Sequence, residues 1–181
     1  MIPSTTYIID NEDVIISTGS NWSEFARENG TTLIDNVIGQ SIWTFISNEK
    51  VQELYKQLFN AVRNLEKNIA INFRCDSDQV MRYMEMAVIY ASDHQLKIET
   101  STIKEVPRKR ILSSPIIYLG IQHGTKMCSC CNKIYLRHSQ QWFEIDYALD
   151  HNLIPEPLNV NFDLCERCKL YLQKKVQLSM A

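Results

Sequence analysis

Two cysteine pairs near the C-terminal end of the 181-residue chain have the spacing of a metal site. Cys128 and Cys131 stand in "MCSCCNKIY", and Cys165 and Cys168 stand in "FDLCERCKL". A two-residue gap lets both sulfurs of a pair reach one ion without backbone strain, and four thiolates at tetrahedral angles suit zinc. The sequence therefore predicts one zinc ion bound by these four cysteines. Iron is the chemical alternative, because the residue pattern separates zinc from iron poorly.

The remaining potential ligands near these pairs are expected to stay outside the site. Cys130 would shorten the first gap to one residue, so we interpret it as a spare thiol, with thiol exchange as the alternative. His123, His138 and His151 are expected on the surface or behind the ligands, because four cysteines complete the coordination. Such a closed site has no open position for a substrate, so its expected role is structural.

Composition and charge narrow the class of protein. The chain is 45% hydrophobic, which is ordinary for a packed soluble core, and its formal charge of −2 gives no general attraction to nucleic acids. No apolar run has the length of a signal peptide or a membrane span, so a cytoplasmic protein is expected. In a reducing compartment six cysteines favour metal binding over disulfides.

The elements that must position these residues begin with a strand and helix pattern over the first hundred residues or so. In chain order we predict a two-stranded hairpin, a short helix, a long helix and three strands, at residues 6–10, 14–19, 20–30, 47–67, 68–77, 80–92 and 95–106. The long helix presents one continuous apolar face, and Ser47 is its expected N-cap. A turn at "SDHQ" is predicted to join the last two strands.

This order of elements resembles that of a PAS domain. The segments "YIIDNEDVIISTGSNWSEFARENG", "VIGQSIWTFI" and "FRCDSDQVMRYMEM" resemble bacterial PAS sensor proteins, a subset of which end in cysteine pairs. The resemblance implies an α+β fold in which a five-stranded antiparallel sheet and flanking helices enclose a pocket. We therefore divide the chain into a PAS-like sensor domain (1–106), a connector (107–125) with basic residues and prolines, and a zinc-binding module (126–181).

The zinc-binding module resembles a treble-clef zinc site. It would consist of a cysteine knuckle, a hairpin within "KIYLRHSQQWFEI", and a helix that starts at the second cysteine pair. Asp163 is the expected cap of that helix, and Leu164, Leu172 and Val176 are expected to make apolar contacts. The sequence "NVNFDL" stands where a small or histidine-containing turn is expected, so this loop should differ. Four nearby cations would offset the thiolate charge: Lys126, Lys133, Arg167 and Lys169.

Nine large side chains could line the implied pocket, although such residues fill a core more often than they bind a ligand. They are Trp22, Phe25, Trp43, Phe45, Tyr55, Phe59, Phe73, Tyr83 and Met86. Arg74 and Asp76 could bind a polar ligand, but we prefer a solvated ion pair at a strand end. Flavin photochemistry is not expected because Cys75 lies in a predicted strand, and haem is not expected because the long helix lacks histidine.

The resemblance implies a non-enzymatic sensor that binds a small molecule or a protein partner and acts through another signalling protein. No glycine-rich phosphate loop or catalytic constellation stands out in the sequence, so we do not expect an enzyme. A thiol enzyme using "CSCC" is a further alternative, disfavoured because metal-bound thiolates are not free to react. The other alternative is nucleic-acid binding, in which the phosphates would contact Arg167, Lys169, Lys174 and Lys175. Acidic residues in the same module oppose this alternative.

Two expectations concern the whole chain. Apolar residues of the connector, such as Ile116 and Leu119, would be covered either in a homodimer or by packing within one chain, and both remain open. Replacing Cys165 by serine is expected to unfold the residues beyond about 126 and to leave the first domain intact, because structural zinc supplies the folding energy of small modules.

Overall fold

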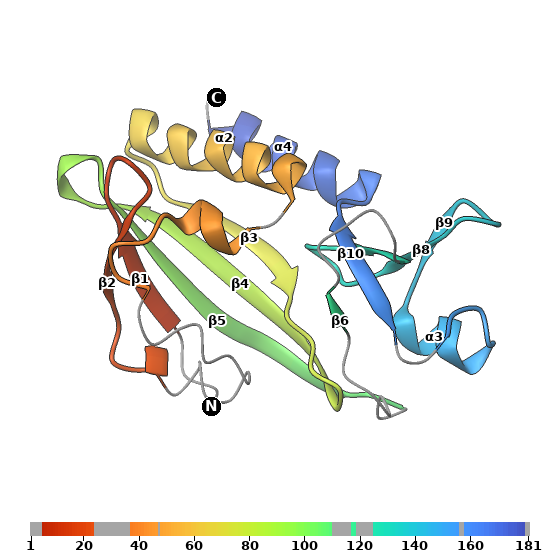
Figure 1. Cartoon of the computed structure of the whole chain (residues 1–181). Coiled ribbons are helices and arrows are strands. Elements are labelled where there is room, and N and C mark those ends of the chain that lie inside the picture. The colour runs from red at the N-terminus through yellow and green to blue at the C-terminus, as the bar shows by residue number, and fades with distance from the viewer. Residues whose placement is uncertain are drawn as a thin grey trace.

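The computed structural model describes residues 5–23, 37–46, 48–109, 117–118, 125–155 and 158–179. The described part contains two sheets, with two helices lying side by side above the first (Figure 1). The first sheet consists of β1 (Thr5–Ile9), β2 (Ile15–Thr18), β3 (Ile69–Arg74), β4 (Val80–Tyr90) and β5 (Leu96–Pro107). The second consists of β6 (Ile117–Tyr118), β7 (Thr125–Cys128), β8 (Ile134–Leu136), β9 (Gln141–Phe143) and β10 (Asn159–Asp163). The helices are η2 (Ile42–Phe45), α2 (Glu49–Leu65), η3 (Ser92–His94), α3 (Ile145–Asp150) and α4 (Glu166–Ser179).

The first sheet has the strand order β2-β1-β5-β4-β3, and every neighbouring pair is antiparallel. This confirms the expected α+β fold, with a five-stranded antiparallel sheet and flanking helices. Alternation along β4 places Met84, Met86 and Val88 in the interior, as a strand with one face packed on helices requires. The predicted turn between β4 and β5 is confirmed as η3. Most of the short helix predicted within residues 20–30 lies outside the described residues.

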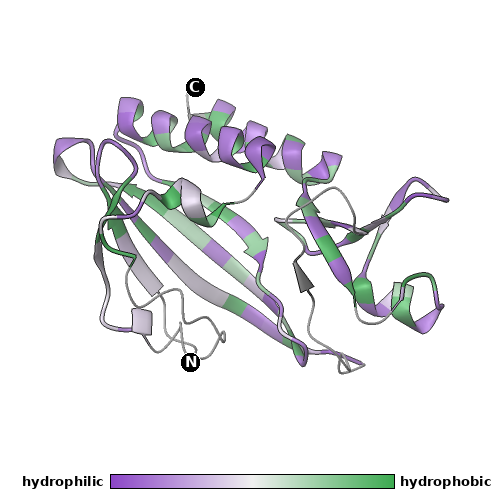
Figure 2. Ribbon diagram, in the orientation of Figure 1, coloured by the Kyte–Doolittle hydropathy of each residue, from purple (hydrophilic) through white to green (hydrophobic). Residues whose placement is uncertain are grey.

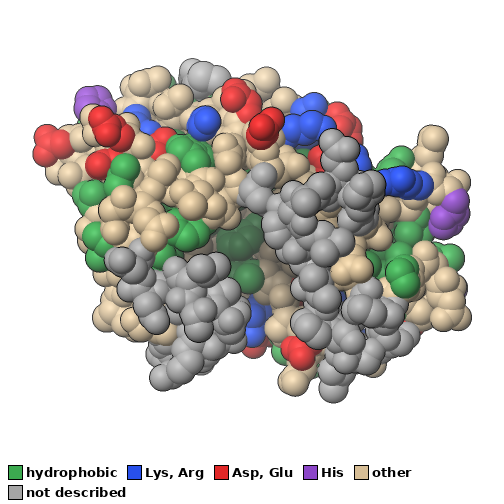
Figure 3. Space-filling view, viewed as in Figure 1, with side chains coloured by type: hydrophobic (Ala, Val, Ile, Leu, Met, Phe, Trp, Pro, Cys, Tyr) green, Lys and Arg blue, Asp and Glu red, His purple; other side chains and the backbone are tan. Residues whose placement is uncertain are grey.

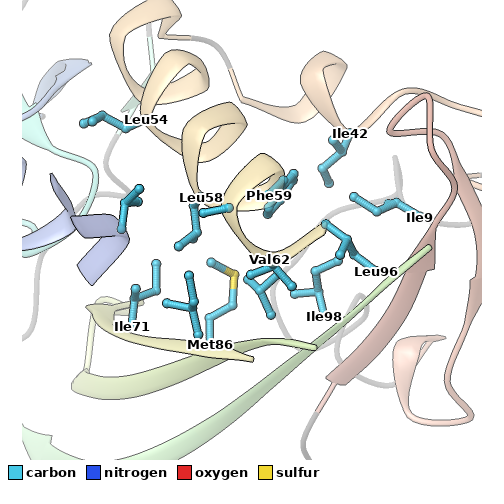
Figure 4. Close-up of a cluster of buried hydrophobic side chains, with 14 of the residues drawn as sticks. Ile9, Ile42, Leu54, Leu58, Phe59, Val62, Ile71, Met86, Leu96 and Ile98 are labelled. Atoms are coloured by element: carbon cyan, nitrogen blue, oxygen red, sulfur yellow. The ribbon is translucent and has the colours of Figure 1, made fainter. Parts of the chain in front are cut away.

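Helix α2 covers the inner face of this sheet. Its buried residues include Leu54, Leu58, Phe59 and Val62, which meet the sheet residues drawn in Figure 4. Its N-cap is Asn48, so the expectation of Ser47 was wrong by one position. The Asn48 side chain accepts hydrogen bonds from the backbone N–H groups of the first turn, at 3.0 and 3.1 Å. We call the described residues 5–109 the PAS-like domain.

The second sheet combines parallel and antiparallel pairs. Strand β10 lies between β6 and β7 and is parallel to both, whereas β7, β8 and β9 are antiparallel neighbours. The β8–β9 pair is the hairpin predicted within "KIYLRHSQQWFEI". We call the described residues 125–155 and 158–179 the cysteine module. Within the connector, the structure describes residues 107–109, the two residues of β6 and residue 125. A dimer that forms through the connector therefore stays a prediction.

Helix α4 of the cysteine module packs against α2 and β3 of the PAS-like domain. Leu172 and Val176, for which apolar contacts were predicted, are buried in the same cluster as Leu54 and Leu58. Leu164 is partly buried against this cluster. The outer sides of both helices are largely hydrophilic in Figure 2, as expected for helices that pack through one face. The two parts therefore share a core, and the domain limits at 106 and 126 stay a prediction.

Candidate metal centre and adjoining cavity

The structure brings the four predicted ligand cysteines together. The sulfur atoms of Cys128, Cys131, Cys165 and Cys168 all lie within 4.8 Å of one another. The sulfurs of Cys131 and Cys165 are 3.8 Å apart. A tetrahedral ion with Zn–S bonds of about 2.3 Å needs sulfurs separated by about 3.8 Å. The cluster is therefore close enough, and of the right donor type, to bind a metal ion.

Local backbone geometry places the first pair. The Cys128 N–H donates to the Lys133 carbonyl at 2.7 Å, and the Asn132 N–H donates to the Cys128 carbonyl at 2.9 Å, which closes the turn between β7 and β8. Asn132 has a φ of 56°, a left-handed conformation that asparagine tolerates well. The Cys165 N–H points at the Cys128 sulfur at 3.4 Å, a contact that favours a thiolate.

The second pair is placed by the start of α4. Cys165 immediately precedes this helix and Cys168 lies in its first turn, so both thiols lie near the positive end of the helix dipole. Asp163, the expected cap, instead lies three residues before the helix, at the end of β10. Its carboxylate accepts a hydrogen bond from the Leu164 N–H at 2.8 Å, so it orders the approach to the helix.

The packed thiols also influence one another's protonation. Hydrogen bonds from Cys131 and Cys168 lower the pKa of the Cys128 thiol, whereas the hydrogen bond to Cys128 raises the pKa of Cys131 to about 12. A metal ion requires all four groups as thiolates, so it must displace the protons that these thiols share. Metal binding by this cluster will therefore weaken as the pH falls.

Three of the cations expected to offset the thiolate charge are paired with carboxylates. Lys126 lies 2.7 Å from Asp163, and Lys133 lies 3.6 Å from Glu144. Lys169 lies 3.9 Å from Glu166 on the exposed side of α4. Paired lysines attract phosphates less than free ones do, so these contacts do not favour the nucleic-acid alternative.

Cys130 is not part of the four-sulfur cluster. Its thiol lies 3.6 Å from the Asn72 carbonyl, and its own carbonyl accepts a hydrogen bond from the Arg74 N–H at 2.8 Å. The Tyr171 hydroxyl accepts from the Asn72 N–H at 2.9 Å. The cysteine module thus satisfies backbone groups along β3, an edge strand of the first sheet. His138 and His151 are exposed and outside the cluster, and His123 is not among the described residues.

A cavity of about 440 Å³ lies between the two parts of the molecule. Of the predicted pocket residues, five line it: Phe45, Tyr55, Phe59, Phe73 and Met86. The cysteine module contributes Met127, Ser129, Asn132 and Phe162 to the opposite wall. In the space-filling view, the face turned toward the reader has a hollow with hydrophobic side chains at its base (Figure 3). The volume lies within the range of small-molecule sites.

Three other predicted pocket residues do not line this cavity. Trp22 packs edge-on against Tyr7, with ring centroids 5.6 Å apart. The Trp43 indole donates to the Asp13 carboxylate at 3.0 Å, and the Tyr83 ring lies against the Arg74 guanidinium at 5.5 Å. Phe25 is outside the described residues. The wall residues from the cysteine module were missed because no sequence pattern indicates which distant segments meet.

Arg74 and Asp76 also line the cavity. We expected a solvated ion pair, but the structure shows that this pair is buried. Only 7% of the Arg74 side chain and 2% of the Asp76 side chain are exposed. Arg74 also donates to Glu144 at 2.6 Å, and Arg108 donates to Asp76 at 3.2 Å and to Asp146. Because Glu144 and Asp146 belong to the cysteine module, this network of buried ion pairs joins the two parts.

The fold and the site define the class of molecule: a PAS-like domain joined to a four-cysteine module that can bind a metal ion. Within the described residues, no helix is both long and apolar enough to cross a membrane. No protein-family model matches the chain, and no curated protein matches its sequence.

Several solved structures resemble part of the chain, among them the following three. A domain of an HTR-like protein from Haloarcula marismortui is 11% identical, with a TM-score of 0.41 over 56% of this chain and 99% of that one. A sensory box sensor histidine kinase from Vibrio cholerae is 12% identical, with a TM-score of 0.40 over 57% and 84%. A C-terminal domain from Streptococcus mutans is 14% identical, with a TM-score of 0.38 over 56% and 77%. These scores are low, so the fold assignment rests on strand order and pairing.

Proposed function

We propose that this protein is a non-enzymatic sensory protein in which the PAS-like domain binds a small molecule and passes the signal to another protein. The observation that carries the proposal is the cavity whose walls come from both parts of the molecule. A ligand there would contact the first sheet, α2 and the cysteine module at once. If it favoured one packing of the two parts, its differential affinity would shift their contacts.

The cysteine module has a structural role in this proposal, with zinc bound by Cys128, Cys131, Cys165 and Cys168. Four sulfur ligands complete a tetrahedral site, which leaves no position for a substrate. The bound ion would hold the knuckle against the first turn of α4, and α4 in turn packs on α2 and β3. Zinc would thus fix one wall of the cavity without taking part in chemistry.

A thermal-shift screen of metabolites tests the sensory role. We expect at least one compound to stabilise the wild type and to stabilise Phe45→Ala less, because Phe45 lines the cavity and tolerates truncation at 42% exposure. Ile38→Ala is the matched control, since Ile38 is 57% exposed and is not a lining residue. Turnover of a screened compound, abolished by Cys130→Ser or Cys75→Ser, would instead indicate an enzyme.

A further inference from the structure

We infer that the cavity takes a neutral, largely apolar molecule that carries one hydrogen-bonding group and is held by both parts of the protein. This inference rests on the proposed small-molecule function and names the chemistry of the ligand. It follows from the charges around the cavity, from two phenol groups in its wall, and from the residues that the cysteine module contributes.

The charges at the polar end of the cavity are already balanced. Among the described residues that line it, only Arg74 and Asp76 are charged. The network that contains them joins three cations to three carboxylates: Arg74, Arg108 and Lys133 to Asp76, Glu144 and Asp146. An anionic or cationic ligand would have to compete with the buried pairs of Arg74 and Arg108 with Asp76, and an unpaired charge is costly in such a place. Charge balance therefore favours a neutral ligand.

Two hydroxyl groups in the wall are available to a ligand. Tyr7 and Tyr55 both line the cavity, and neither hydroxyl makes a hydrogen bond to a described residue. Burial raises the pKa of both phenols, so both are neutral at physiological pH. Both tyrosines are only partly buried, so their hydroxyl groups can bond to water when no ligand is present, and a ligand that displaces this water needs a donor or acceptor to replace the bond. The other lining side chains are mostly aromatic or aliphatic, which suits an apolar body.

The cysteine module closes the cavity from the other side. Phe162 lies on β10, and its carbonyl accepts a hydrogen bond from the Asn48 side chain at 2.7 Å. Ser129 lies in the knuckle, where its N–H donates to the Asp163 carbonyl at 2.9 Å. Asn48 is also the N-cap of α2, so one residue ties the start of this helix to the cavity wall. A ligand would thus be bound only while the cysteine module is in place.

Three matched probes test the ligand chemistry on the full chain: naphthalene, 2-naphthol and 2-naphthoate. They share one apolar body and differ in hydrogen bonding and charge. By titration fluorimetry we expect 2-naphthol to bind tighter than naphthalene by about threefold to tenfold, the size of one net hydrogen bond. We expect it to bind tighter than 2-naphthoate by at least about tenfold, because the carboxylate would be buried without a partner.

Variants then locate the site. The double change Tyr7→Phe and Tyr55→Phe should remove the preference for 2-naphthol over naphthalene, whereas the matched change Tyr90→Phe should leave it, because Tyr90 does not line the cavity. Ser129→Phe should fill the cavity from the cysteine module and weaken 2-naphthol binding at least about tenfold. Phe162→Ala gives a second test from the same wall, and an unchanged metal content and circular dichroism spectrum show that a variant is folded.

Some outcomes would overturn the inference. Binding of 2-naphthoate as tight as that of 2-naphthol would refute a neutral ligand. Probe binding that folded Ser129→Phe and Phe162→Ala leave unchanged would refute the shared site, and absence of any probe binding would refute both. The sensory proposal fails separately: if the probes behave as expected but no metabolite stabilises the wild type through Phe45, the cavity chemistry stands and the sensory role does not.

Discussion

The carboxylate of Asp76 connects three separate parts of the chain. It accepts hydrogen bonds from Arg74, from Arg108 and from the backbone N–H of Arg82, and only 2% of its side chain is exposed. Arg108 continues the connection to Asp146 on α3. Such a pair is costly to disrupt, because removal of one partner leaves the other charge buried and uncompensated.

Arg108→Ala should therefore lower the free energy of unfolding by about 3–5 kcal/mol, measured by urea titration. The control is Lys97→Ala, whose ion pair with Glu99 is exposed and should contribute less than about 1 kcal/mol. Equal effects of the two substitutions would contradict the role assigned to the buried network.

The metal content of two cysteine variants should distinguish the predicted ligand cysteines from Cys130. Cys130→Ser should keep one metal ion per chain, because the four predicted ligand cysteines supply four clustered sulfurs without Cys130, although Cys130 packs beside them. Cys131→Ser, a change one residue further on, should lose most of the metal at micromolar concentration. Elemental analysis of both purified variants decides the point, and retained metal in Cys131→Ser with loss in Cys130→Ser would reverse the assignment.

The clustering of the four cysteines could be predicted from the sequence because their spacing is local and chemically specific. The sequence did not predict the partners of Arg74 and Arg108, since Glu144 and Asp146 lie 70 and 38 residues away. An ion pair at such separation depends on how the elements pack, and charges alone do not reveal it. For the same reason Arg74 and Asp76 were expected in solvent.

At the scale of elements, helix α4 takes part in both the cysteine cluster and the core shared with the PAS-like domain. Its first turn carries Cys168 of the four-cysteine cluster, and its later turns bury Leu172 and Val176 against α2. The apolar spacing predicted contacts for these residues but could not identify α2 as their partner. Strands β6 to β10 were harder to predict, because they are only two to five residues long and β10 pairs with strands distant in sequence.

Leu172→Ala should destabilise the protein by about 2–5 kcal/mol, the usual cost of deleting a buried leucine. Leu170 provides the matched control two residues away, because it is 59% exposed and its truncation should cost no more than about 0.5 kcal/mol. Both values can be taken from thermal or chemical unfolding followed by circular dichroism. A small effect of Leu172→Ala would mean that α4 does not pack on α2 in solution.

At the scale of the whole molecule, the shared core changes the expected result of metal loss. Sequence alone suggested that Cys165→Ser would leave the first domain intact. Because α4 and the Cys130 carbonyl contact α2 and β3, we now expect faster amide hydrogen exchange in β3 as well as in the cysteine module. Exchange of β3 at the wild-type rate in Cys165→Ser would show that the two parts fold independently.

The central claim is that a metal-held cysteine module completes a ligand cavity on a PAS-like domain. Native mass spectrometry of the full chain purified from cells tests this most directly, because it detects metal and small molecule together. We expect each chain to carry one zinc ion and, in part of the population, one small molecule that is released when a chelator removes the zinc. Chains that lack metal when freshly purified, or that keep the small molecule after chelation, would contradict the claim.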